Sequence, residues 1–171
     1  MANEIILVDE KDNEIGVAEK LKAHLQGKLH RCFSILIFNS RGETLLQKRA
    51  KGKYHSGELW SNACCSHPRP GEDIKKEAEK RLKEEMGIES DLKEVLSFIY
   101  KANLGDLTEH EFDHVFVGKF DGDPKINLKE ADDWQWVAIQ TLKEDVKENP
   151  QNYTIWFKLI LEKWHDAFSK L

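Results

Sequence analysis

The chain has 171 residues, and 40% of them are hydrophobic, which is ordinary for one globular domain with a sizeable core. Its net charge of −5 comes from interspersed acidic and basic residues, so we expect no nucleic-acid partner, although a small anion could still bind. The apolar runs are too short to span a bilayer, and the N-terminus is too acidic for a signal peptide. We therefore expect a cytoplasmic protein with no membrane partner, built as a single domain over residues 1–171.

Two hairpins are predicted at the start of the chain. Residues 5–8 and 14–19 flank one turn, and residues 31–39 and 43–49 flank a Ser-Arg-Gly turn. A helix is predicted over 72–87, because acidic residues come early in this segment and a glycine ends it. The sequence shows no linker rich in proline, glycine or serine that would mark a second domain.

The second half of the chain adds strands and then helices. Strands are predicted at 95–102, 110–120 and 134–139, followed by a helix from about Leu142 and an amphipathic helix over 153–168. This order predicts an α/β or α+β fold, in which one sheet is packed by helices on its faces.

The three cysteines are interpreted as reduced thiols, because neighbouring residues cannot bridge without strain and the third then has no partner. Cys32, beside an apolar run, is interpreted as a small buried side chain. In an extended segment Cys65 and His67 point to one face, whereas Cys64 points to the other. One thiol and one imidazole are therefore expected on the same side.

The segment Thr-Glu-His-Glu-Phe-Asp-His shows the same alternation. It places Glu109, Glu111 and Asp113 on one face of a strand, with His110 and His114 on the other. Carboxylates that share a face of a partly apolar strand repel each other unless a cation lies between them. The pattern therefore favours a metal site on this strand.

Histidines elsewhere in the chain could complete such a site. His24 and His30 precede the core strands, and with His67 and the two glutamates they form a set of five nitrogen and oxygen donors. Such a set is open to Mg²⁺, Mn²⁺, Fe²⁺ or Zn²⁺. The remaining histidines that bear on this question are interpreted as surface or structural residues: His55, His114 and His165.

The predicted helix carries two charges near its apolar stripe. At about 100° per residue, Arg81 and Glu85 project into or beside the arc that buries Leu82. Two interpretations stay open: a mutual ion pair worth about 0.3 kcal/mol if exposed, or an arginine and a carboxylate aimed at an anion and its metal. The other charged residues of the helix are interpreted as a solvated face: Glu77, Glu79, Lys80, Lys83 and Glu84.

Residues 71–88 resemble a degenerate Nudix box. The positions that match are Glu72, Leu82, Glu84, Glu85, Gly87 and Ile88, and the positions that depart from the motif are Ser66, Lys80 and Arg81. Arg81 replaces a glutamate with which Nudix hydrolases hold metals, so the departure argues against diphosphate hydrolysis. Together with "SNACCSHPRPGE", "HLQGKLHR" and "EHE", the pattern from about Lys20 to Trp156 resembles the type I isopentenyl-diphosphate isomerase branch of the Nudix superfamily.

The resemblance implies a Nudix-like α/β (α+β) fold, in which a mixed sheet lies between helices and carries an added N-terminal hairpin. It also implies an enzyme of isoprenoid biosynthesis that interconverts isopentenyl diphosphate and dimethylallyl diphosphate, by protonation and deprotonation through a tertiary carbocation. It implies Cys65 as the catalytic thiol and Glu111, assisted by Tyr100, as the second acid-base group. The metal in a His₃Glu₂ site would be Mg²⁺, Mn²⁺ or Zn²⁺, and its ligands would be His24, His30, His67, Glu109 and Glu111.

The resemblance also implies how a small allylic or homoallylic diphosphate would bind. Glu85 would hold a Mg²⁺ carried by the diphosphate, and Trp156, which alone would be interpreted as a core aromatic, would lie over the hydrocarbon end. The diphosphate oxygens would be bound by Lys20, Arg49, Lys53 and Arg81. The other tryptophans are interpreted as packing residues: Trp60, Trp134, Trp136 and Trp164.

Further expectations and two alternatives accompany this interpretation. An ordinary thiol has a pKa of about 8.5, and nearby carboxylates and cations shift it in opposite directions, so we expect Cys65 to titrate near neutrality. The alternatives to an isomerase are a Nudix-type diphosphohydrolase and a non-catalytic diphosphate-binding module. We expect a monomer or a weak homodimer.

Overall fold

The structure is a computed structural model that describes residues 3–53 and 55–163. A central strand, β3 (His30–Phe38), organises the sheet by pairing in parallel with β8 (Leu107–Lys119) and antiparallel with three other strands. Within the described residues the sheet has nine strands, and the remaining seven are β1 (Glu4–Val8), β2 (Glu14–Glu19), β4 (Glu43–Arg49), β5 (Trp60–Asn62), β6 (Cys64–Ser66), β7 (Lys93–Leu104) and β9 (Ala131–Ala138).

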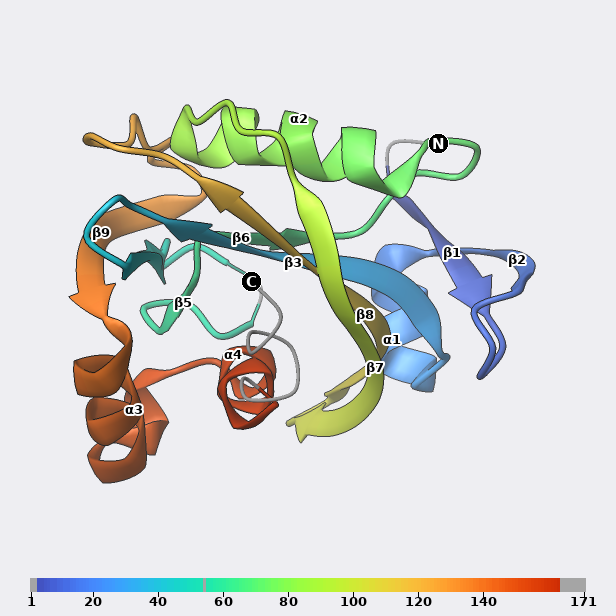
Figure 1. The fold of residues 1–171 in the computed structure, drawn as a ribbon. Helices are drawn as coiled ribbons and strands as arrows, with labels where there is room; N and C mark the ends of the chain where they lie inside the picture. The colour runs from blue at the N-terminus through green and yellow to red at the C-terminus, as the bar shows by residue number, and fades with distance from the viewer. Residues whose placement is uncertain (1–2, 54, 164–171) are drawn as a thin grey trace.

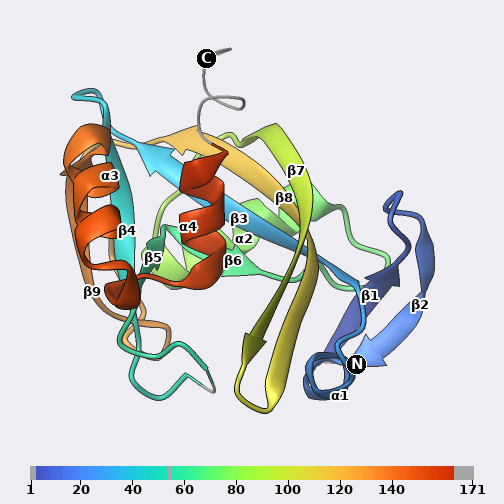
Figure 2. The same cartoon turned by 90° about the horizontal axis from the view of Figure 1, so that it is seen from below.

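Helices cover both faces of this sheet (Figure 1). α2 lies across one face, whereas α3 and α4 lie on the opposite side, and the β1–β2 hairpin with α1 extends from one end (Figure 2). The bounds of the helices are α1 (Lys20–Gln26), α2 (Ile74–Met86), α3 (Ile139–Glu148), a 3₁₀ turn (Pro150–Asn152) and α4 (Ile155–Glu162). The predicted α+β fold, with a mixed sheet between helices and an N-terminal hairpin, is confirmed.

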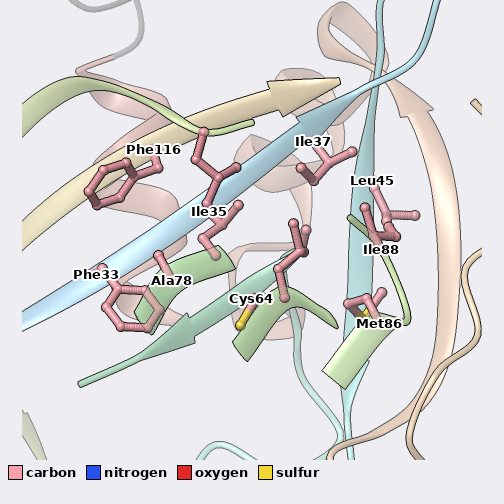
Figure 3. Packing of buried hydrophobic residues seen from close by; sticks show 12 residues of the cluster. Phe33, Ile35, Ile37, Leu45, Cys64, Ala78, Met86, Ile88 and Phe116 are labelled. Atoms are coloured by element: carbon pink, nitrogen blue, oxygen red, sulfur yellow. The ribbon is translucent and has the colours of Figure 1, made fainter. Parts of the chain in front are cut away.

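Alternation along β3 divides the core into two layers. Phe33 and Ile35 point toward α2 and lie in one cluster with Ala78 of that helix (Figure 3). The same cluster holds the fully buried Leu82, whereas Leu36 belongs to the opposite layer, which contains Trp156 of α4. Because successive side chains of a strand face opposite sides, one apolar strand supplies both layers. The two layers fix the positions of α2 and α4 relative to the sheet between them.

The ends of α2 explain why its prediction came close. The Asp73 side chain accepts a hydrogen bond from the Lys76 backbone N–H at 3.0 Å, and Gly87 ends the helix with φ of 67°. A Cβ at Gly87 would also lie 2.8 Å from the Lys125 side chain, so glycine suits both the turn and the close approach.

The interpretation of Glu77 as a solvated residue of this helix was wrong. Glu77 is 4% exposed, and its carboxylate lies 3.2 Å from the Lys80 ammonium.

Boundaries near the C-terminus differ from the sequence prediction. α3 begins at Ile139, earlier than predicted, and α4 begins at Ile155, later than predicted. Tyr153 is extended instead, because it forms a parallel bridge with Trp60 before the helix starts. The end of the predicted last helix, with His165 and Trp164, lies outside the described residues.

The described tryptophans take the packing positions that were expected. Trp134 and Trp136 pack against the layer under α2, and Trp60 packs against the layer under α4.

None of the helices in the described ranges combines the length and the apolar content needed to cross a membrane.

Candidate active site

A cavity of about 200 Å³ opens on the sheet between the N-terminal part of the chain, α2 and α4. Its volume suits a small molecule and not a polymer. Ten of the residues singled out from the sequence line it: Lys20, Arg49, Lys53, Cys65, His67, Arg81, Glu85, Glu109, Glu111 and Trp156. The other three do not line the cavity but contact Glu109 or Glu111, which do: His24, His30 and Tyr100.

β8 presents its carboxylates to this cavity as the alternation predicted. Glu109 and Glu111 are 2% and 6% exposed and line the cavity, and Asp113 is buried on the same face. His110 and His114 point the other way: the His110 ring lies 2.9 Å from the Gly27 carbonyl, and the His114 ring contacts carboxylates at the surface. The repulsion expected between the inward carboxylates is therefore present in the fold.

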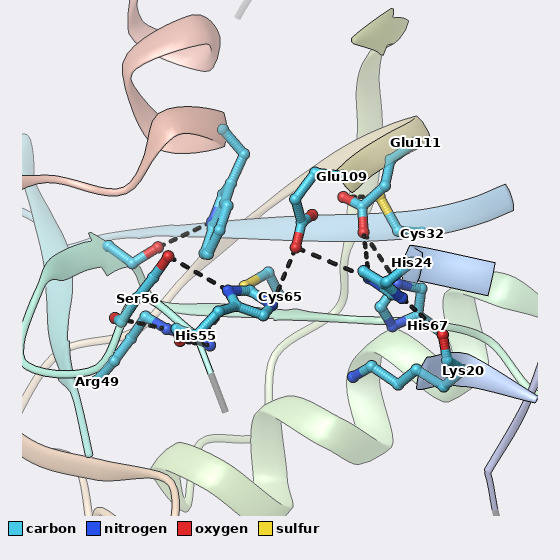
Figure 4. A network of polar contacts seen from close by, with 12 residues as sticks. Lys20, His24, Cys32, Arg49, His55, Ser56, Cys65, His67, Glu109 and Glu111 are labelled. Atoms are coloured by element: carbon cyan, nitrogen blue, oxygen red, sulfur yellow. Dashed lines mark hydrogen bonds and ion pairs between the residues drawn. The ribbon is translucent and has the colours of Figure 1, made fainter. Parts of the chain in front are cut away.

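Two histidines approach these carboxylates with one ring nitrogen fixed by the backbone, and Figure 4 shows one of them, His24, beside Glu109. His24 Nδ1 lies 2.8 Å from the Lys20 carbonyl, and His30 Nδ1 lies 2.8 Å from the Lys28 carbonyl. A donor at Nδ1 leaves the Nε2 lone pair directed at the carboxylates. His30 Nε2 is buried 3.3 Å from Glu111 Oε1 and has no hydrogen-bond partner among the described residues. A proton or a metal ion between these two atoms removes the repulsion between them and favours the ionised form of Glu111.

The donor set fits a divalent metal ion. One ligand atom from each of His24, His30, His67 and Glu111 lies within 4.8 Å of the others, and Glu109 Oε1 lies 3.7 Å from His24 Nε2. Burial lowers the pKa of His67 to about 3, so its ring is neutral, as a metal ligand must be. Four of the five residues predicted as one shell therefore meet at one place, whereas Glu109 forms a second group with His24 and His55.

The two glutamates have opposite electrostatic environments. Burial and the neighbouring Glu111 raise the pKa of Glu109, whereas Glu111, although burial opposes its ionisation, keeps a low pKa through contacts with His30 and His67. The Tyr100 hydroxyl donates to Glu111 Oε2 and lies 3.1 Å from Glu109 Oε2. Glu111 is therefore the ionised member of the pair, and its Oε2 accepts a hydrogen bond from the Tyr100 hydroxyl.

Cys65 lies on β6, and β3 separates this strand from β8 and its glutamates. Its sulfur is 3.9 Å from Arg49 Nη1, yet burial outweighs this cation and raises the pKa of the thiol to about 12. The expectation of a thiol that titrates near neutrality was wrong, because desolvation is the larger effect. The Trp156 ring forms the adjoining wall, held by a 3.0 Å hydrogen bond from Nε1 to Ser61 Oγ, with the Arg49 guanidinium 5.1 Å from its centroid.

Cations gather at the end of the cavity next to α2. Arg81 and Glu85 form an ion pair, as one of the two open interpretations predicted, and both line the cavity, so the other interpretation stays a prediction. Gln47 Nε2 also donates to Glu85 at 3.2 Å, which fixes a carboxylate that is 3% exposed. Lys53 lies at the same end.

Comparisons with known proteins agree with this geometry. A family profile described as NUDIX domain matches residues 28–157. The chain is 51% identical over 164 residues to isopentenyl-diphosphate Delta-isomerase 2 of Aromatoleum aromaticum, covering 95% of this chain and 87% of that protein. It is 52% identical to isopentenyl-diphosphate Delta-isomerase of Serratia proteamaculans, covering 92% of this chain and 89% of the other. The chain belongs to the isopentenyl-diphosphate Delta-isomerase family of NUDIX proteins.

Solved structures show the same fold at low identity. A Deinococcus radiodurans protein superposes with a TM-score of 0.78 at 15% identity, covering 96% of this chain and 99% of that one. A MutT protein from Methanosarcina mazei has a TM-score of 0.67 at 18% identity, covering 81% and 94%. The resemblance to the isopentenyl-diphosphate isomerase family that the motifs indicated is confirmed.

Three cavity residues of this family member were missed or misjudged from the sequence. His55 was interpreted as structural, but its Nε2 lies 2.9 Å from Glu109 Oε1, and its ring lies edge-on to Trp156. The Cys32 thiol, besides being buried, donates to Glu111 Oε2 at 3.1 Å. Glu130, which no motif singled out, pairs with Lys53. Each depends on a contact between distant segments, and no local pattern signals it.

Proposed function

We propose that this protein interconverts isopentenyl diphosphate and dimethylallyl diphosphate by proton transfer, within isoprenoid biosynthesis. The observation that carries the proposal is one small cavity lined by a thiol, Cys65, by an ionised carboxylate, Glu111, and by several cationic side chains. The sequence identity of about half with named isomerases over most of the chain supports it.

These two groups supply what the reaction needs. Moving the double bond requires one proton to be added to one carbon and another to be removed from a second carbon, with no redox cofactor. Cys65 holds a proton on its sulfur and Glu111 offers an ionised oxygen, so one group can donate while the other accepts. Tyr100, whose hydroxyl donates to Glu111, completes the acid-base group on that side.

The wall formed by Trp156 suits the intermediate. A tertiary carbocation near a desolvated indole face gains about 2 kcal/mol, and a closed apolar wall excludes the water that would quench the cation. Trp156 is 3% exposed and belongs to the apolar layer under α4, so its ring is already held in place.

Metal and diphosphate are assigned to separate ends of the cavity. We propose that His24, His30, His67, Glu109 and Glu111 hold a divalent ion, Mg²⁺, Mn²⁺ or Zn²⁺, which would fix Glu111 and favour its ionised form. Glu85 would hold a Mg²⁺ that enters with the diphosphate. The oxygens of the diphosphate would be bound by Lys20, Arg49, Lys53 and Arg81.

We also propose that the whole chain works as one domain. The NUDIX match begins at residue 28, yet Lys20 lines the same cavity and His24 contacts its glutamates. The N-terminal segment is therefore part of the site and not an appendage.

Conversion of isopentenyl diphosphate in D₂O with Mg²⁺, followed by NMR of the carbon-bound protons, tests the proposal. We expect dimethylallyl diphosphate to form with deuterium incorporation, and Cys65→Ala to abolish it. Cys64→Ala is the matched control, because Cys64 is fully buried on the opposite face and should keep the activity. Full activity of Cys65→Ala would contradict the assigned role, and release of phosphate would favour the Nudix-type diphosphohydrolase, which Arg81 argues against.

A further inference from the structure

Glu130 occupies the cation-rich end of the cavity without a role in the proposed reaction. It lies just before β9, lines the cavity, and has a side chain that is 21% exposed. Its carboxylate forms an ion pair with the Lys53 ammonium, and its other oxygen lies 3.4 Å from Arg81 Nη2. The Glu130 carboxylate thus contacts two of the four cationic side chains that were assigned to the diphosphate, Lys53 and Arg81.

A second carboxylate shares the same guanidinium nitrogen. Glu85 Oε1 pairs with Arg81 Nη2, so Glu85 of α2 and Glu130 of the turn before β9 both contact one nitrogen atom. With Lys53 and Arg81 the group has two positive and two negative charges, and its formal sum is zero. A subsite built for a bare anion would leave its cations free of carboxylates, because a multiply charged phosphate and a carboxylate repel each other.

Such an arrangement suits an anion that brings its own cation. Mg²⁺ is held in proteins by one or two carboxylates together with the phosphate oxygens of its ligand. The carboxylates that repel a free diphosphate attract the chelated one, since the metal lies between the two kinds of oxygen. The pair of carboxylates therefore discriminates by the charge of the ligand and not by its shape.

We propose that Glu130 makes this end of the cavity selective for metal-chelated diphosphate over metal-free diphosphate, by competing for Lys53 and Arg81 and by joining Glu85 in attracting the metal. The inference rests on the proposed function, because it takes this end of the cavity to bind the diphosphate. Glu130 acts here as a specificity-determining residue and takes no part in proton transfer.

The backbone around Glu130 supports a fixed position. Its N–H donates to the Asn127 carbonyl at 2.8 Å, and its own carbonyl accepts from the Ala50 N–H at 3.0 Å. The second bond ties Glu130 to the segment that carries Lys53. The carboxylate is therefore held against the cations from both sides.

A neighbouring glutamate provides a matched control. Glu84 also pairs with Arg81, at 2.8 Å from Nη1, but its side chain is 42% exposed and it does not line the cavity. Glu84→Gln removes the same charge from the same arginine at a position screened by solvent. A difference between Glu84→Gln and Glu130→Gln therefore reports on the cavity and not on Arg81 alone.

Calorimetric titration with inorganic pyrophosphate, once with Mg²⁺ and once with a chelator, tests the proposal on the full chain. We expect the wild type and Glu84→Gln to prefer the Mg²⁺ form, and Glu130→Gln to lose at least about tenfold of this preference through tighter binding of metal-free pyrophosphate. Glu130→Ala should behave in the same way, and circular dichroism verifies that each variant is folded.

The outcomes separate this inference from the function on which it rests. Tight binding by all variants with an unchanged preference for the Mg²⁺ form would overturn the role of Glu130 and leave the diphosphate site intact. Failure of the wild type to bind pyrophosphate in either form would overturn the diphosphate site itself, and the inference with it.

Discussion

Removal of one hydroxyl behind the cavity should slow the reaction without weakening substrate binding. Tyr100 is 6% exposed, does not line the cavity, and donates its O–H to Glu111. Tyr100→Phe removes one hydrogen bond to a charged group, worth about 1.5–3 kcal/mol. Since about 1.4 kcal/mol is a factor of ten in rate, we expect kcat to fall by about 10- to 100-fold while KM stays nearly constant.

Steady-state conversion of isopentenyl diphosphate measures this effect, and a second tyrosine controls for the loss of a buried hydroxyl. Tyr153 is 4% exposed and donates to Asp145 in the layer under α4, away from the metal-binding cluster. Tyr153→Phe should lower the free energy of unfolding by about 1 kcal/mol and leave kcat unchanged. If Tyr100→Phe kept kcat within about twofold of wild type, the hydroxyl would have no part in tuning Glu111.

Three further substitutions test the metal site, a buried charge and the core. His30→Gln should weaken binding of a divalent ion by about 100-fold in a chelator competition, whereas His110→Gln, on the other face of β8, should not. Burial raises the pKa of Asp113 from 3.8 to about 7, so the stability it contributes is complete below pH 3.8 and is lost as the pH rises to 7. In urea denaturation, the free energy of unfolding of Asp113→Asn should therefore exceed that of the wild type by about 4 kcal/mol at pH 8 and equal it at pH 4. Leu82→Ala, at a fully buried site outside the cavity, should cost about 3 kcal/mol of stability and leave kcat unchanged below the unfolding transition.

Local periodicity predicted the parts of the site that lie on single elements. The alternation in β8 placed Glu109 and Glu111 on one face, and the helical period of α2 placed Arg81 and Glu85 beside its buried stripe. The motif around Cys65 indicated the isopentenyl-diphosphate isomerase family, which the sequence relatives confirm. These features depend on side-chain direction within one strand or helix, which the sequence determines by itself.

Contacts between distant segments could not be predicted in this way. His55 reaches Glu109 from a loop between β4 and β5, and a loop has no repeat from which a direction follows. Glu130 was missed for the same reason. The pKa of Cys65 depends on how completely α4 and the sheet remove water from the thiol, and burial of that kind is a property of the assembled fold.

The parallel pairing of β3 with β8 has a kinetic consequence. It sets His30 directly opposite Glu111, and much of the chain between these two strands must be placed before they can meet. Pairing of this non-local kind forms slowly during folding, so the donors that hold a metal are assembled late. A bound ion should therefore slow unfolding and leave the folding rate nearly unchanged. Metal would then lengthen the lifetime of the native chain and would not guide the chain toward its fold.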